Sequence, residues 1–137
     1  MPTLGIVEVH WRPEATGDAL LGALAAGGRF TPVPSMHADA IVDLPPGAAW
    51  LASSDTYPFQ AFRLGSAWGL QLHPEAGPDT LRRWADAAAA PDALGVADRY
   101  AARAQELSAV GQSIAVGFAA VVRQSVMRSS ASTIVYA

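Results

Sequence analysis

Residues 57–75, YPFQAFRLGSAWGLQLHPE, decide the fold of this 137-residue chain. Apolar residues recur with a two-residue period in residues 59–64 and again in residues 68–72, which is the pattern of two short strands. Gly65 lies in the link between these runs, as is typical of a tight hairpin. The second run ends at His73-Pro74-Glu75, where Pro74 favours extended backbone at His73. The segment therefore predicts a β-hairpin that ends in a histidine and a carboxylate.

Upstream of the hairpin, the sequence predicts three more strands and one helix. Residues 3–11 form an imperfectly alternating apolar run that Pro13 ends. Asp18 can cap a helix over residues 18–26, which ends before a pair of glycines. The remaining strands are expected at residues 30–37 and 48–53, with a proline-rich turn between them. We therefore expect a mostly antiparallel meander from residue 30 to 72 that extends a sheet begun by residues 3–11.

Downstream of Glu75 the apolar period becomes helical. A helix is predicted over residues 78–90 and a longer one over residues 93–124, with Gly111 and Gly117 as possible breaks. The long apolar stripe of the second helix is expected to pack on the rest of its own domain. Residues 128–137 give no helical signal and are predicted to form a loose tail, with a terminal strand as an option. Together these elements predict an α/β fold.

Composition excludes several classes of protein. Hydrophobic residues make up 51% of the chain and charged residues 15%, which argues against intrinsic disorder. A net charge of -3 without a basic run argues against a nucleic-acid partner. The N-terminus does not resemble a signal peptide, and the apolar stretch near residues 114–122 is too short to span a bilayer. We therefore expect a cytoplasmic protein with no membrane partner.

Two of the three histidines are followed, two residues later, by a carboxylate. These segments are His37-Ala38-Asp39 and His73-Pro74-Glu75, and each closes a predicted strand. Side chains two apart on a strand share a face, so each carboxylate can orient its imidazole. One alternative is that both segments are ordinary polar strand ends. Another is a zinc, iron or manganese site built from all four histidine and carboxylate side chains.

The motifs around these histidines resemble the C-terminal half of class I glutamine amidotransferases, in particular the amidotransferase domain of the GMP synthase type. Residues 69–75 match the family's G-x-Q-F-H-P-E strand end, with Leu72 in place of Phe. Three other segments match upstream motifs of the family in order and spacing, at Met36-His37-Ala38-Asp39, residues 44–48 and residues 51–54. The resemblance covers residues 3–90. It implies part of a flavodoxin-like sandwich in residues 1–92, with residues 93–127 as a helical extension packed on it.

The resemblance also implies a reaction. In this family a cysteine attacks the carboxamide of glutamine, a histidine accepts the thiol proton, and a glutamyl thioester forms as ammonia leaves. His73 matches this general base, and Glu75 matches the carboxylate that orients it. Met36, Ala38 and Asp39 match the turn that holds the amino-acid end of glutamine. The resemblance implies neither a cofactor nor a metal.

The chain has no cysteine, so the family's nucleophile is missing. Ser113 lies in the nearest approach to a G-x-S-x-G elbow, but Ala115 fills the last position and the surroundings are helical. We therefore predict an N-terminally truncated amidotransferase that does not hydrolyse glutamine as an isolated chain. Uncovered strand edges and helix faces would then favour self-association or a Cys-bearing partner chain. The alternative is a non-catalytic pseudoenzyme or regulatory remnant.

Overall fold

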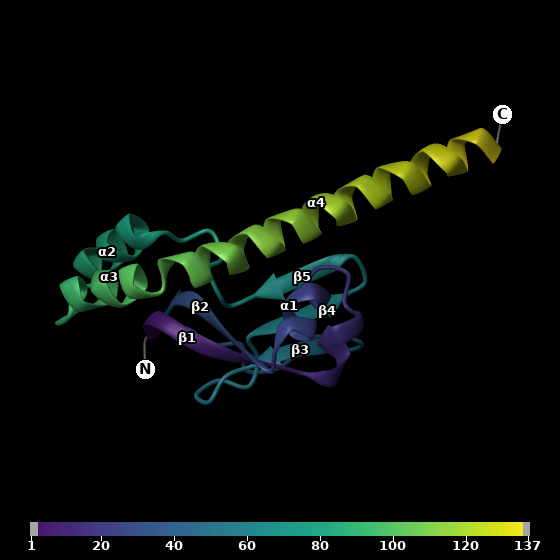
Figure 1. Cartoon of the computed structure of the whole chain (residues 1–137). Helices are drawn as coiled ribbons and strands as arrows, with labels where there is room; N and C mark the ends of the chain where they lie inside the picture. Colours follow the sequence, from purple (N-terminus) through teal and green to yellow (C-terminus); the bar gives the residue numbers. More distant parts are fainter. Residues whose placement is uncertain (1–2, 136–137) are drawn as a thin grey trace.

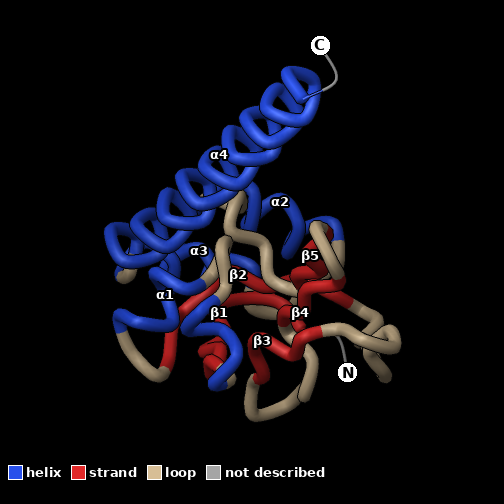
Figure 2. The backbone as a smooth tube through the Cα atoms, turned by 90° about the vertical axis from the view of Figure 1, so that its right-hand side faces the viewer, coloured by secondary structure: helices blue, strands red, loops and turns tan. Residues whose placement is uncertain are grey.

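The computed structural model describes the backbone of residues 3–135 and the side chains of residues 3–130. It contains one five-stranded antiparallel sheet in the order β2-β1-β3-β4-β5 (Figures 1 and 2). The strands are Thr3–Trp11 (β1), Phe30–His37 (β2), Ala49–Ser53 (β3), Ala61–Leu64 (β4) and Ala67–Leu70 (β5). The predicted α/β fold is therefore confirmed. The predicted meander holds for β3, β4 and β5 only, because β1 lies between β2 and β3.

The sheet curls until its two outer strands approach each other. An isolated antiparallel bridge joins Ser35 of β2 to Leu72, just beyond β5. Pro32 and Pro34 lie in β2, and because proline has no N–H, an outer strand is where they fit. The chain thus brings its own β2 and its post-β5 segment together at one residue pair, and the expectation of uncovered strand edges stays a prediction.

The helices differ from the predicted ones in three places, and the first is that the helix expected over residues 18–26 begins only at Gly22. The observed helices are the 3-10 helix Pro13–Gly17 (η1) and the α-helices Gly22–Gly27 (α1), Pro78–Ala87 (α2), Ala93–Ala102 (α3) and Ala104–Val135 (α4). The single helix expected over residues 93–124 is interrupted at Arg103, whose N–H bonds to the Tyr100 carbonyl in a tightened turn. The loose tail expected from residue 128 is helical through Val135, because neither glycine nor proline interrupts the chain after Gly117. Residues 136–137 lie outside the described residues.

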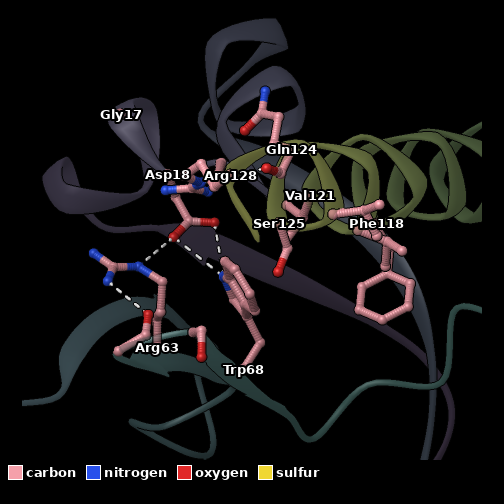
Figure 3. Close-up of a pocket in the computed structure, with 14 residues that line it drawn as sticks. Gly17, Asp18, Arg63, Trp68, Phe118, Val121, Gln124, Ser125 and Arg128 are labelled. Carbon is pink, nitrogen blue, oxygen red and sulfur yellow. Dashed lines mark hydrogen bonds and ion pairs between the residues drawn. The ribbon is translucent and has the colours of Figure 1, made fainter. Parts of the chain in front are cut away.

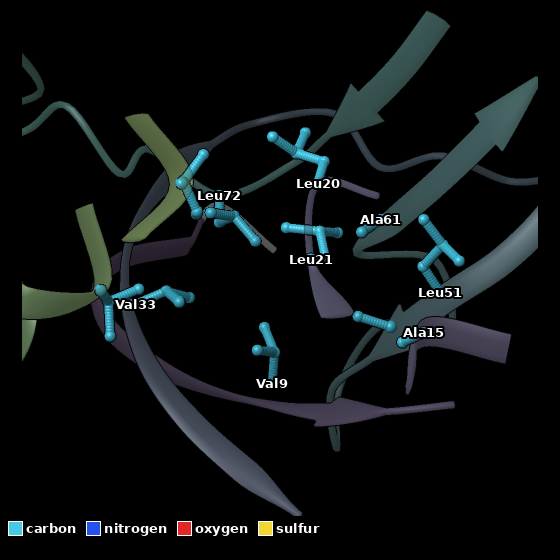
Figure 4. Packing of buried hydrophobic residues seen from close by; sticks show 11 residues of the cluster. Val9, Ala15, Leu20, Leu21, Val33, Leu51, Ala61 and Leu72 are labelled. Atoms are coloured by element: carbon cyan, nitrogen blue, oxygen red, sulfur yellow. The ribbon is translucent and has the colours of Figure 1, made fainter. Parts of the chain in front are cut away.

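Strand β1 separates two hydrophobic cores. Its odd-numbered Val7 and Val9 contact the larger core, and its even-numbered Leu4 and Ile6 contact the smaller one. Successive side chains of a strand point to opposite faces, which explains this division. The larger core lies within the curled sheet beneath α1 and α4 (Figure 4), and the smaller core lies among α2, α3 and the start of α4.

Two glycines allow α4 to approach the rest of the molecule closely. A Cβ atom on Gly111 would lie 2.6 Å from the Pro74 carbonyl oxygen, and one on Gly117 would lie 2.9 Å from the Leu20 carbonyl oxygen. Both distances are shorter than normal van der Waals contact, so larger residues would push the helix away. The expectation that these glycines break the helix was wrong. They are contact points, and Gly111 fixes α4 beside the His73-Pro74-Glu75 segment.

The second half of α4 projects beyond the sheet (Figure 1). Leu107, Val110 and Ile114 are buried, but every side chain from Val122 to Ser130 is exposed. By length and composition alone, α4 is long and apolar enough to cross a membrane. This corrects the expectation that the apolar stretch near residues 114–122 is too short, because the helix as a whole is longer than that stretch.

Candidate functional site

His73 and Glu75 form a hydrogen-bonded pair directly after the sheet. The Nδ1–H of His73 donates to Oε1 of Glu75 at 2.8 Å. The segment is held in place because the His73 N–H donates to the Pro34 carbonyl at 2.8 Å, next to the Ser35–Leu72 bridge. The expected pairing of this histidine with this carboxylate is therefore confirmed. Its role in catalysis stays a prediction.

The other ring nitrogen of His73 faces the end of β2. Its Nε2 lies 3.1 Å from the carbonyl oxygen of Met36. The ring is thus held between Glu75 and the end of β2. The 36–39 turn and the His73 segment meet at one rim, as expected.

Trp84 of α2 packs against the imidazole of His73. Their ring centroids lie 4.9 Å apart in an edge-to-face arrangement. The His73 side chain is 36% exposed and the Glu75 side chain 65% exposed, so solvent reaches the pair. The site therefore has one face packed on Trp84 and another face open to a molecule from outside. Sequence reasoning missed Trp84, because an aromatic at helical spacing is ordinarily a core residue.

The second histidine segment is arranged differently. His37 Nδ1 bonds to the backbone carbonyl of Asp39 at 2.8 Å, while Ala38 and Asp39 are exposed. The His37 ring packs edge-to-face on Tyr57, with the centroids 5.0 Å apart. Hence the sequence spacing that gives a carboxylate–imidazole pair at His73 gives a backbone turn at His37.

The described residues do not support the alternative metal site. Among residues 3–130, no group of three or more histidine or carboxylate side chains is placed to hold a metal ion. His37 and His73 each bond within their own segment or to a backbone carbonyl. Ser113, the alternative nucleophile, lies within helix α4 and not at a strand-to-helix elbow.

A buried aspartate forms a second polar cluster that sequence reasoning treated only as a helix cap. Asp18 accepts hydrogen bonds from the N–H groups of Leu20 and Leu21, both at 2.9 Å, within the turn that precedes α1. The expectation that Asp18 caps the α-helix was wrong, because α1 begins at Gly22 with Leu21 as its N-cap. Asp18 also accepts hydrogen bonds from Arg63 Nε and Trp68 Nε1, each at 3.0 Å (Figure 3). Its side chain is fully buried, so this cluster ties α1 to the β4–β5 hairpin.

Solved structures with a similar fold are glutamine amidotransferases. A glutamine amidotransferase from Thermotoga maritima matches 81% of this chain and 48% of its own, with a TM-score of 0.65 and 24% identity. One from Methylobacillus flagellatus matches 86% of this chain and 52% of its own, with a TM-score of 0.69 and 18% identity. No protein-family model and no curated protein matches the chain.

These matches agree with the motifs around His73. The chain spans about half the length of each of these two solved structures. The matched part covers more than four fifths of this chain. The chain therefore has the fold of about half of a class I glutamine amidotransferase.

Proposed function

We propose that this chain supplies the histidine and glutamate of a Cys-His-Glu triad for glutamine amide hydrolysis. The observation that carries the proposal is the 2.8 Å hydrogen bond from His73 Nδ1–H to Glu75 at the end of the sheet. The cysteine comes from outside these 137 residues, because the sequence contains none. The substrate is free glutamine, and the setting is the cytoplasm.

In the proposed reaction His73 takes up and returns one proton. Nε2 accepts the proton of the cysteine thiol, and the thiolate attacks the carboxamide carbon of glutamine. Glu75 accepts the Nδ1–H bond throughout and stabilises the imidazolium that forms. His73 then returns the proton to the departing nitrogen, which leaves as ammonia, and water hydrolyses the thioester to glutamate.

The 36–39 turn holds the other end of the substrate in this proposal. Met36 lies beside His73, and Ala38 and Asp39 are exposed on the same rim. Main-chain groups of this turn would bind the amino-acid end of glutamine, as the motif resemblance implies. The Met36 carbonyl oxygen also lies within hydrogen-bond distance of His73 Nε2, so the incoming cysteine has to replace this contact.

The Met36 contact favours one second candidate, a non-catalytic regulatory remnant. Such a protein needs no free Nε2, and in this structure Nε2 has a backbone partner. The two candidates differ in one measurable property, which is whether His73 supports turnover once a cysteine is supplied.

The test is a chimera. The part of the Thermotoga maritima amidotransferase that the match leaves uncovered is fused ahead of residue 1, and glutamate release from glutamine is measured. We expect turnover by the chimera and only background from this chain alone, because no thiol is present. The control replaces the cysteine of the added half by alanine, which should return the rate to background.

Two results would contradict the proposal. One is a folded, monodisperse chimera without turnover, which favours the regulatory remnant. The other is turnover by this chain alone that disappears in His73→Ala, because it would mean that the chain uses a nucleophile other than an added cysteine.

A further inference from the structure

The projecting half of α4 carries an uncovered apolar stripe. Phe118, Val122 and Val126, which we call the α4 stripe, follow one another at four-residue spacing and so share one side of the helix. They are 55%, 45% and 60% exposed, respectively. The valines of α4 lower its helix propensity, and most of the stability of a helix in a protein comes from the packing of its apolar face. The stripe therefore needs a covering surface.

A groove runs beneath the stripe. It lies between α4 and the β4–β5 hairpin, and its larger part has a volume of about 790 Å³. Phe118 and Val121 face Trp68 across it (Figure 3). Phe118 and Trp68 also line a neighbouring hollow of about 550 Å³, which extends to Glu75. One side of the groove is thus apolar, and an exposed carboxylate lies at its far end.

We infer that a second copy of this chain covers the stripe, with the two α4 helices packed antiparallel. Charge favours this partner. Residues 1–106 hold seven arginines and all twelve acids, a formal net charge of -5, whereas residues 107–137 hold Arg123 and Arg128 and no acid. The projecting helix of one copy is therefore attracted to the body of another.

The direction and register follow from the same residues. In a parallel pair, Arg123 and Arg128 of one helix would lie beside the same two arginines of the other helix, and these like charges would repel each other. An antiparallel pair centred on Val122 places Phe118 against the partner's Val126 and brings the partner's Arg128 level with Val116. That level lies near Ala115 and Glu75, which line the same hollow, so the arginine approaches a carboxylate. Antiparallel packing also aligns the two helix dipoles favourably.

A lipid bilayer fits the helix less well than a second copy does. The uncharged stretch of α4 is residues 107–122, and its first half is already packed on the core through Leu107, Val110 and Ile114. The projecting half contains both arginines, which are costly within hydrocarbon. This interface is independent of glutamine chemistry and of any cysteine.

Sedimentation equilibrium of the full chain at micromolar concentration tests the interface. We expect a dimer, and we expect Val122→Glu to weaken association about a hundredfold or more, because two carboxylates would meet at the two-fold axis. Met127→Glu is the matched control: it is 71% exposed but lies about 140° away around the helix, so the dimer should persist. Circular dichroism checks that both variants are folded.

Single cysteines test the register, because the natural chain contains none. Oxidation of mixed Phe118→Cys and Val126→Cys variants should yield the mixed disulfide in preference to either homodimer. A monomer at tens of micromolar, equal weakening by both glutamate variants, or preferential homodimer cross-links would overturn the inference. So would stable α4-dependent flotation with anionic phosphatidylserine vesicles by a chain that is monomeric in solution.

Discussion

The two histidine segments have the same spacing in the sequence but different structures. At His73 the carboxylate of Glu75 accepts the ring N–H, whereas at His37 the backbone carbonyl of Asp39 faces the ring nitrogen. Pro74 restricts the backbone at His73 and lacks an N–H, while Ala38 leaves its turn unrestricted. A histidine and a carboxylate two residues apart therefore form a hydrogen bond only where the backbone holds their side chains close together.

Neighbouring elements add to the difference. His73 is fixed by the Pro34 carbonyl, by the Met36 carbonyl and by Trp84, which come from β2 and α2. His37 packs on Tyr57, a residue that belongs to no helix or strand. We conclude that His73 is the segment built to hold an imidazole in one orientation, and that the 36–39 segment is built to present a backbone turn.

The largest expected effect separates the two histidines. In the active chimera, His73→Ala should reduce glutamine turnover by at least about 10³-fold, because the thiol loses its base. His37→Ala should change the rate by less than about tenfold, since that ring bonds to its own turn and packs on Tyr57. Steady-state glutamate release measures both rates. Equal losses in the two variants would remove the distinction between the segments.

The carboxylates should differ in the same direction. Glu75→Gln is expected to lower turnover by about 10²-fold, because the amide is a weaker acceptor for the imidazolium. Asp39→Asn should leave turnover within about threefold of the parent, because Asp39 contacts His37 through its backbone oxygen. A pH–rate profile for each variant provides the measurement. A loss in Asp39→Asn as large as that in Glu75→Gln would contradict this assignment.

A substitution in α4 should change the surroundings of His73 but not those of His37. Gly111→Ala places a Cβ 2.6 Å from the Pro74 carbonyl oxygen, so we expect a loss of about 1–3 kcal/mol in the free energy of unfolding. The NMR signals of His73 should shift while those of His37 stay in place. Gly27→Ala is the control, because nothing lies within 4 Å of its added Cβ. Urea unfolding that ranked the control as the less stable variant would refute this contact.

Much of this architecture follows from local sequence pattern. The meander of β3, β4 and β5 was predictable because period-two runs are separated by turn residues, and the His73–Glu75 pair because it lies within a linked set of motifs. The Ser35–Leu72 bridge and the close approach of Gly111 to Pro74 were not, because each joins residues more than thirty positions apart. The helical residues 128–135 were missed because serine and threonine have weak helix propensity, although no breaker stands before them.

The smallest expected effect concerns the exposed ion pair between Asp92 and Arg99. It serves as a reference for how much an exposed pair such as His73–Glu75 contributes to the free energy of unfolding. Asp92 accepts a hydrogen bond from Arg99 Nη1 at 2.7 Å, which lowers the pKa of the Asp92 carboxyl, and both side chains are largely exposed. A carboxylate whose pKa is lowered on folding adds stability above its unfolded pKa and loses it as the pH falls through the folded value. Solvent screening keeps that contribution small.

Asp92→Asn should therefore change the Tm at pH 7 by an amount close to the precision of the measurement, and the difference from the parent should vanish near pH 2. Thermal melts by circular dichroism at both pH values provide the test. Because Glu75 is also exposed, Glu75→Gln should shift the Tm as little, and its loss of turnover would then reflect catalysis and not unfolding. A Tm drop of more than about 5 °C in Asp92→Asn would contradict the premise that exposed pairs contribute little.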